Sequence, residues 1–454
     1  MEKSRLAQAR KKKHWTLKQA ANAVGVSINT FNRWELGEQR PYRHNLDQLC
    51  KIFNASLEEL GFGFEAINAV QPPPHPLIID LFGHDLVMRL QSVAFVPQRF
   101  EAVQRQVTTI LEEFDTMHGD MMTRRDALLR LASLPLIASL RPGMPVRQPT
   151  DVITQCAAGM AACWHLSESS LEEDLHRAFK AASAYIPALK SIVEHSSQYR
   201  QDAAALVGQC SLLKTVLGWH LVGLKQAISY AQDAITYAQA AEDMTLQVTA
   251  MDYQSWAYYY DQQSKLAVQT AAQAHALVRL YEAKLPPILS SGVCCSYAVM
   301  QARNGEPGSV RIFEQAEKYF LISSQGTPSH YIYTGYTLSD MFVNYGIMQY
   351  FSGEHGKAQD AFYQLIDPQQ LTTKLPLSGR TRVETLNFMA LSSLKQKDKD
   401  MEQTIRFWKA AMNGAVSLQS EQRYTEAHLT YEIMDAVWPN EKKIKELREL
   451  TIHW

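Results

Sequence analysis

Beyond residue 150 the sequence contains almost no β-strand pattern, and this limits what the chain can fold into more than any other feature. Long segments rich in Ala and Tyr carry apolar residues at helical spacing, and Gly, Pro or polar clusters interrupt them about every twenty residues. Such segments predict pairs of antiparallel helices. We expect these pairs at Tyr199–Ala241, Thr245–Ala283, Leu289–Phe320, Ser339–Pro368 and Thr381–Leu418, with a terminal pair at Gln422–Leu450.

The unit that begins at Ser339 shows this pattern most clearly. Gly346, Ala358 and Phe362 stand twelve and four residues apart, and Pro368 ends the second helix. This spacing resembles a tetratricopeptide repeat, in which small residues let two helices approach and an aromatic side chain fills the gap between pairs. The resemblance implies that residues 151–454 form a right-handed α-solenoid of tetratricopeptide-like helix pairs, within an all-α chain.

The first 62 residues contain signals for five short helices. Thr16 can cap a helix over Leu17–Val24, and Ser27 can cap a helix over Ile28–Leu36. Gly25 between them permits a tight turn. The other three helices are expected to open at Leu6 and to cover Asn45–Phe53 and Ser56–Leu60.

Nine residues of this segment stand at the mutual spacing of a known family: Thr16, Ala21, Gly25, Val26, Ser27, Arg33, Glu35, Gly37 and Pro41. The segment therefore resembles the Cro/lambda-repressor-like (XRE-type) helix-turn-helix regulators. One position departs from the family, whose members commonly have Gln near the start of the second helix, where it meets the DNA backbone. This chain has Leu17 there, and Gln19 lies roughly 200° further around the helix, so it cannot simply substitute.

The resemblance implies roles for residues near the third helix, whose outward face would enter a major groove. The alternative is that this face is only solvated. Val26, Phe31 and Trp34 are expected on the buried side. Contacts to bases are expected from Ile28, Asn29, Thr30, Asn32 and Arg33, and contacts to phosphates from Lys11, Lys12, Lys13, Lys18, Arg40 and Arg43. Arg10 and Glu35 match positions that form a structural ion pair in relatives.

The charge of the chain is divided between its two ends. Residues 1–60 hold eleven Lys and Arg against six acidic residues, whereas the remainder holds 34 against 40. The first segment is thus about +5 and the rest about −6, as expected when one end meets phosphates. The net charge of −1 hides this division.

A proline-rich stretch over residues 71–76 and a second break over residues 141–149 divide the chain further. We predict a DNA-binding domain over 1–65, a linker with connecting helices over 66–150, and the repeat domain over 151–454. Between the two breaks, apolar residues recur at helical spacing from Phe100 to Phe114. This stripe is either a dimer seam or a helix that packs on its own domain.

Tyrosines and other aromatic residues are frequent in the expected repeats, for example at residues 253–260 and 331–350. On a concave face they would suit the capture of a signalling peptide or a small ligand, and otherwise they fill the core between helix pairs. Arg303, Asn344 and Tyr345 are the candidate ligand-binding residues.

Several function classes find no support in the sequence. The phosphate-loop, His-Glu-x-x-His, Gly-x-Ser-x-Gly and paired cysteine–histidine motifs are absent, so we expect neither an enzyme, a metal site nor a cofactor. The six cysteines form no C-x-x-C pair, and no uncharged apolar run is long enough to span a membrane. A cytoplasmic protein is the simplest expectation.

These observations predict a sequence-specific DNA-binding transcriptional regulator. Its repeat domain would sense a peptide or small ligand, mediate homodimerisation, or both. Coupling would require a ligand that binds one dimer geometry better than another. The alternative is an interaction scaffold, in which the repeats recruit a protein partner and the DNA-binding module only localises it.

Overall fold

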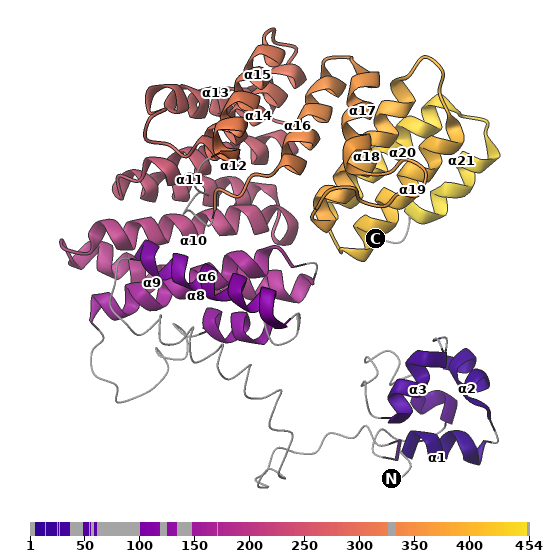
Figure 1. Cartoon of the computed structure of the whole chain (residues 1–454). Coiled ribbons are helices and arrows are strands. Elements are labelled where there is room, and N and C mark those ends of the chain that lie inside the picture. Colours follow the sequence, from indigo (N-terminus) through magenta and orange to yellow (C-terminus); the bar gives the residue numbers. More distant parts are fainter. Residues whose placement is uncertain are drawn as a thin grey trace, which may run out of the picture. The chain divides into compact units, whose positions relative to one another are not determined.

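The computed structural model contains two compact units, Met1–Pro76 and Leu77–Trp454 (Figure 1). Nearly all of the described residues are helical, and the only β feature among them is an isolated bridge between Ile366 and Thr373. No helix among the described residues is long and apolar enough to cross a membrane. The structure describes residues 5–13, 15–24, 26, 28–36, 49–53, 55, 59–60, 100–118, 125–133, 148–169, 171–325 and 333–451.

The N-terminal unit contains α1 (Arg5–Lys12), α2 (Leu17–Val24) and α3 (Ile28–Leu36), followed by helical residues 49–53. Its core gathers the apolar faces of these helices, with Phe31 and Leu49 fully buried. The predicted bounds of the second and third helices are confirmed. Residues 49–53 of the fourth predicted helix are helical, whereas most of the fifth predicted helix lies outside the described residues.

The second unit is an array of antiparallel helix pairs, and the predicted all-helical class is confirmed. Each predicted pair from residue 199 onward is present, although the last one ends in a short helix. The hand of the superhelix stays a prediction. The pairs are α10 (Arg200–Leu221) with α11 (Leu224–Ala240), α12 (Met244–Tyr260) with α13 (Ser264–Leu280), α14 (Pro287–Arg303) with α15 (Ser309–Ser324), α16 (Leu338–Phe351) with α17 (His355–Leu365), α18 (Gly379–Lys395) with α19 (Met401–Ser417), and α20 (Glu421–Val437) with α21 (Lys442–Glu446) and a 3-10 turn, Leu447–Thr451.

The tetratricopeptide-like packing is present in the pair α16–α17. A Cβ atom added to Gly346 would lie only 2.3 Å from Cε1 of Phe362, so the two helices approach as closely as glycine permits. The Phe362 ring in turn stacks on Phe388 of the next pair, with ring centroids 6.1 Å apart. The roles predicted for the small residue and the aromatic residue are thus confirmed.

One helix pair was not anticipated: α8 (Pro149–Ser167) with α9 (Glu172–His195). Every residue from Ile153 to Trp164 is buried, because α6, α9 and α10 all pack on α8. A helix that is buried all round shows no helical period in its sequence. The second helix was missed because it contains Pro187, and proline inside a sequence segment usually indicates the end of a helix.

The middle of the chain packs on this array. Helix α6 (Phe100–His118) contacts α8, and its residues Val103, Val107 and Leu111 are fully buried in the core of the array. Gln104 of α6 donates a buried hydrogen bond of 2.7 Å to Gln209 of α10. Of the two alternatives for this stripe, packing on its own domain is therefore the one observed for these residues.

Candidate functional site

Helices α2 and α3 of the N-terminal unit form a tight helix-turn-helix. The amide of Val26 donates to the carbonyl of Ala21, five residues earlier and 3.0 Å away, which is the hydrogen bond that closes a helix in a Schellman motif. Phe31 and Trp34 of α3 are buried against α1 and α2, at 0% and 2% exposure. These contacts fix the rotation of α3, so that one particular face of the helix turns outward.

Thr16 and Gln19 form a reciprocal cap at the start of α2. The amide of Gln19 donates to Oγ1 of Thr16 at 3.2 Å, and the amide of Thr16 donates to Oε1 of Gln19 at 2.9 Å. This is the capping box of a Thr-x-x-Gln sequence. The sequence analysis considered Gln19 only as a displaced DNA contact, although the spacing of the box was visible. In the structure Gln19 holds the helix start in place.

The predicted pair of Arg10 and Glu35 joins α1 to the end of α3. Nε and Nη2 of Arg10 donate to the two carboxylate oxygens of Glu35 at 2.6 and 2.9 Å, and Nη1 donates to the carbonyl of Trp15 at 2.8 Å. The two side chains are only 12% and 8% exposed. The hydrogen bonds that Arg10 donates to Glu35 raise the pKa of Arg10. The pair lies within the unit and orients α3.

All five base-reading candidates lie on α3. By helix periodicity, positions 29, 32 and 33 fall on the face opposite Phe31 and Trp34, whereas positions 28 and 30 lie at its edges. Asn32 is half-buried. The side chains of the other four, Ile28, Asn29, Thr30 and Arg33, lie outside the described ones, so their contact roles stay predictions.

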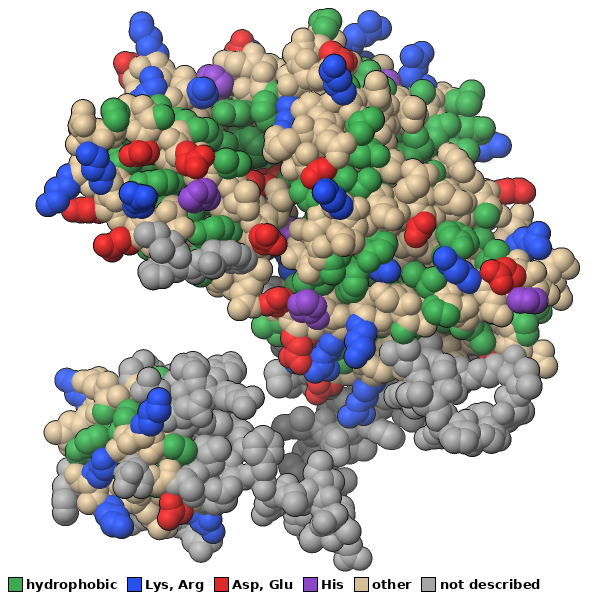
Figure 2. Space-filling view, turned by 180° about the vertical axis from the view of Figure 1, so that it is seen from behind, with side chains coloured by type: hydrophobic (Ala, Val, Ile, Leu, Met, Phe, Trp, Pro, Cys, Tyr) green, Lys and Arg blue, Asp and Glu red, His purple; other side chains and the backbone are tan. Residues whose placement is uncertain are grey.

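The phosphate candidates divide into two kinds. Lys11, Lys12 and Lys18 are exposed, and Figure 2 shows Lys and Arg side chains across the described surface of this unit with little acid between them. Lys13 is also exposed, but its ammonium group contacts the carbonyl of Ile52 and lies 5.1 Å from the ring of Trp15. Lys13 thus stabilises the end of the fourth helix. Arg40 and Arg43 lie outside the described residues.

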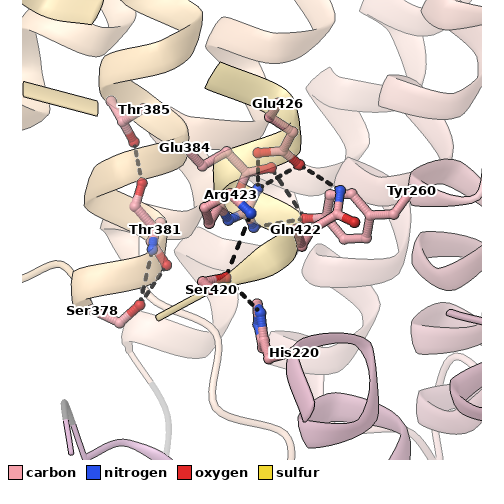
Figure 3. A network of polar contacts seen from close by, with 10 residues as sticks. All are labelled: His220, Tyr260, Ser378, Thr381, Glu384, Thr385, Ser420, Gln422, Arg423 and Glu426. Carbon is pink, nitrogen blue, oxygen red and sulfur yellow. Dashed lines mark hydrogen bonds and ion pairs between the residues drawn. The ribbon is translucent and has the colours of Figure 1, made fainter. Parts of the chain in front are cut away.

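The helical array contains a buried ionic network that the sequence analysis did not anticipate (Figure 3). Arg423 of α20 donates to Glu384 of α18 at 3.0 Å, to Glu426 at 2.6 Å and to the hydroxyl of Tyr260 of α12 at 3.2 Å. Arg423 is 5% exposed and Glu384 is 8% exposed. Burial lowers the pKa of Arg423, but the two carboxylates outweigh it and raise that pKa well above its usual value.

A second contact links the same region to α10. Nδ1 of His220 lies 3.2 Å from Oγ of Ser420, two hundred residues later in the chain. Burial lowers the pKa of His220 well below its usual value, and the nearby Arg380 and Arg423 lower it further. The ring is therefore neutral at neutral pH, and it can accept or donate a hydrogen bond without adding charge. Together the two contacts join α10, α12, α18 and α20.

Aromatic side chains of α10 and α12 border this network, and a buried acid lies on α12 about two turns before Tyr260. The ring of Trp219 lies 5.5 Å from that of Tyr260 and 6.1 Å from that of Tyr253. Asp252 precedes Tyr253 on α12, and its Oδ1 is buried without a hydrogen-bond partner among the described residues. Burial raises the pKa of Asp252 to about 7. Of the five α12 aromatics only Tyr259 is buried, and the other four are partly exposed.

The three predicted ligand-binding residues each have partners within the fold. Arg303 donates to the carbonyl of Tyr259 at 2.7 Å and stacks on its ring, while Asn344 donates to the hydroxyl of Tyr336 at 3.1 Å. The ring of Tyr345 packs against Phe313 at 4.9 Å. No hydrogen bond or ring contact among the described residues joins any two of the three, so their ligand role stays a prediction.

Comparison with known proteins identifies the N-terminal domain. A family model described as Helix-turn-helix matches residues 6–60. The HTH-type transcriptional regulator AnsR of Bacillus subtilis (strain 168) is 35% identical over 60 residues, which cover 13% of this chain and 52% of AnsR. The chain therefore spans about half the length of this curated relative. Residues 6–60 form a helix-turn-helix domain.

Two solved structures resemble the chain over most of its length at low identity. One is NprR in complex with its cognate peptide NprX, at 14% identity and a TM-score of 0.43, covering 83% of this chain and 91% of NprR. The other is Bacillus thuringiensis PlcR in complex with the peptide PapR7 and DNA, at 10% identity and a TM-score of 0.32, covering 71% of this chain and 94% of PlcR.

Proposed function

We propose that this chain, whose residues 6–60 form a helix-turn-helix domain, is a sequence-specific DNA-binding transcriptional regulator of the cytoplasm. The observation that carries the proposal is the rigid placement of α3. Its buried face is held by Phe31 and Trp34, and its end is tied to α1 by Arg10 and Glu35. A recognition helix needs such a support because base contacts depend on its orientation in the groove.

In this proposal α3 enters the major groove. Ile28, Asn29, Thr30, Asn32 and Arg33 read base edges, and the exposed Lys11, Lys12 and Lys18, with Arg40 and Arg43, contact phosphates. Lys13 contributes less to phosphate binding than its neighbours, because its ammonium group already contacts Ile52 and the ring of Trp15.

The test is selection of bound sequences from a random DNA pool, followed by gel shifts with variants of the full chain. Arg33→Ala should weaken binding to the selected site by roughly 1–3 kcal/mol and relax preference at one base. Lys12→Ala is the matched control, which should weaken binding to all sequences and reduce the salt dependence. Equal losses on specific and random DNA for Arg33→Ala would refute its assignment as a base reader.

We further propose that the helical array is the sensing or dimerising part of the regulator. The support is the region around Arg423, where charged, aromatic and unpaired polar side chains from helices far apart in sequence meet. A peptide or small ligand that contacts several of these helices would bind one arrangement of the array better than another. Analytical ultracentrifugation with and without selected DNA tests the homodimer, since a monomer bound to a single half-site would contradict it.

A protein-interaction scaffold is the second candidate. It is favoured by Leu280 at the end of α13 and by Leu321 and Ile322 on α15, which are 71%, 60% and 56% exposed. Exposed apolar side chains of this size commonly mark interaction surfaces when they cluster. Pull-down of a stoichiometric protein together with no sequence preference on DNA at physiological salt would favour the scaffold over the regulator.

A further inference from the structure

A hollow of about 340 Å³ lies between α13, α14 and α15, which stand together in Figure 1. Its volume falls at the lower end of the range of small-molecule sites. The polar groups that line it include Arg279 and His275 from α13, Gln301 from α14, and Arg311 and Gln315 from α15. None of these residues belongs to the helix-turn-helix domain or to the Arg423 network.

Two positively charged side chains line the hollow. Arg279 and Arg311 both line it, and neither forms an ion pair within the part of the chain that the structure describes. The carboxylate of the neighbouring Glu306 accepts a hydrogen bond of 2.7 Å from the side chain of Asn304. Two guanidinium groups on adjacent helices are well suited to bind the oxygens of a phosphate or carboxylate group.

The start of α15 adds to the positive electrostatic potential in the hollow. The helix begins after Gly308, whose φ of +103° is a left-handed conformation that favours glycine, and no side chain caps its first turn. The first intrahelical bond is donated by Ile312 to Gly308, so the earlier amides have no acceptor within the helix. Because Gly308 and Arg311 line the hollow, this positive helix end adjoins it.

A buried side chain without a partner gives independent support for a ligand. Gln301 is only 9% exposed, and its Nε2 donates to the hydroxyl of Tyr297 at 3.1 Å, while Oε1 has no hydrogen-bond partner among the described residues. An amide can turn by 180°, so the unpaired position holds either its oxygen or its NH₂ group. An unpaired polar atom at such depth costs free energy, which a bound polar group would recover.

The third polar element of the hollow is a neutral ring. His275 is 8% exposed, and its Nε2 lies 3.3 Å from Oε1 of Gln315. Burial lowers the pKa of His275, so it contributes hydrogen-bonding capacity and not charge at neutral pH. A neutral ring of this kind can form hydrogen bonds with the hydroxyl groups that a ligand carries beside its charged group.

We propose that this hollow binds the oxyanion group of a small hydroxylated metabolite. Arg279, Arg311 and the first amides of α15 hold the oxyanion, and Gln301, Gln315 and His275 contact the neighbouring hydroxyls. The proposal goes beyond DNA binding and sensing near Arg423, because it assigns the array a separate ligand site.

Isothermal titration calorimetry on the full chain tests this site with three probes: glycerol 3-phosphate, inorganic phosphate and succinate. The first two should bind, and glycerol 3-phosphate should bind more tightly because of its hydroxyls. Arg279→Gln and Arg311→Gln should each weaken binding about five- to tenfold. The expected loss of affinity is this small because both side chains are exposed and solvent screens their charge. Gln301→Leu should weaken glycerol 3-phosphate more than inorganic phosphate.

The matched control is Lys265→Gln, which removes the same charge from α13 about 21 Å further along the helix. It should leave the dissociation constants unchanged, and circular dichroism should show that all variants are folded. Binding of succinate alone, with the same dependence on both arginines, would support a carboxylate as the oxyanion in place of a phosphoester. No heat with any probe at millimolar concentration, or equal weakening by Lys265→Gln, would overturn the proposal.

Discussion

The contact between Gly346 and Phe362 allows a sharp test of how closely α16 and α17 pack. In Gly346→Ala the new Cβ would lie 2.3, 2.6 and 2.8 Å from three atoms of the Phe362 ring, where carbon atoms normally stand about 3.5–4.0 Å apart. The ring is fully buried and stacks on Phe388, so it has little room to retreat. Overpacking of this severity costs about 3 kcal/mol, and the better helix propensity of Ala offsets about 1 kcal/mol.

The expected net effect is therefore a loss of about 2 kcal/mol in the free energy of unfolding. Urea unfolding of the full chain, followed by far-UV circular dichroism, measures it, and variants are compared only where the slope of the transition is unchanged. Phe362→Leu in the same background should reduce the cost of Gly346→Ala, because the clashing ring is gone. A double-mutant cycle gives the interaction energy directly.

The matched control for this test is Gly356→Ala, in the first turn of α17. Nothing lies within 4 Å of a Cβ added there, so the substitution should stabilise the chain by about 0.5 kcal/mol through helix propensity alone. Substitution of glycine by alanine should thus lower the free energy of unfolding at position 346 and raise it at position 356 of the same repeat. If Gly346→Ala proved neutral, or as stabilising as Gly356→Ala, the close approach of the two helices would be refuted.

Two further predictions concern the buried charges of the array. Arg423→Met should destabilise the chain by about 3–5 kcal/mol in urea unfolding, because Glu384 would stay buried without its partner. Arg423→Met combined with Glu384→Leu should recover most of this loss. If the double variant recovered nothing, the two residues would not stabilise the chain as an ion pair. Burial raises the pKa of Asp252 to about 7 from an ordinary 3.8, so its protonated form contributes stability that is full below about pH 4 and is lost as the pH rises through 7. Asp252→Asn should therefore stabilise the chain at pH 8 by about 2 kcal/mol, less than the whole pKa shift implies because part of the residue stays exposed, and should have no effect near pH 4. Thermal unfolding at both pH values checks it, and an equal effect at both would contradict the buried, protonated state.

The helices of this chain could be predicted where local signals are strong. Thr16 and Ser27 marked the starts of α2 and α3, and polar clusters marked the turns of the array from residue 199 onward. The pair α8–α9 was missed because α6, α9 and α10 together cover α8 on all sides, so no polar face remained to show its helical period. Burial by distant segments erases the local pattern on which such predictions depend.

The residues of the candidate sites also differ in whether the sequence alone could identify them. The pair of Arg10 and Glu35 was predicted through the family resemblance, and the structure brings the two side chains together. The contacts of Arg423 with Glu384 and of His220 with Ser420 were missed, because these partners are 39 and 200 residues apart along the chain. Arg303 and Asn344 were chosen by residue type alone, and both prove to bond within the fold.

The sequence by itself determined the helical class, the positions of most helices and the helix-turn-helix domain, because capping residues, helical spacing and turn residues act over a few positions. Only the tertiary structure decided that α6 packs on the array and that a charged cluster joins α12, α18 and α20. These features arise when segments far apart in the chain exclude water from one another, and the free energy of that burial depends on partners that no local pattern identifies.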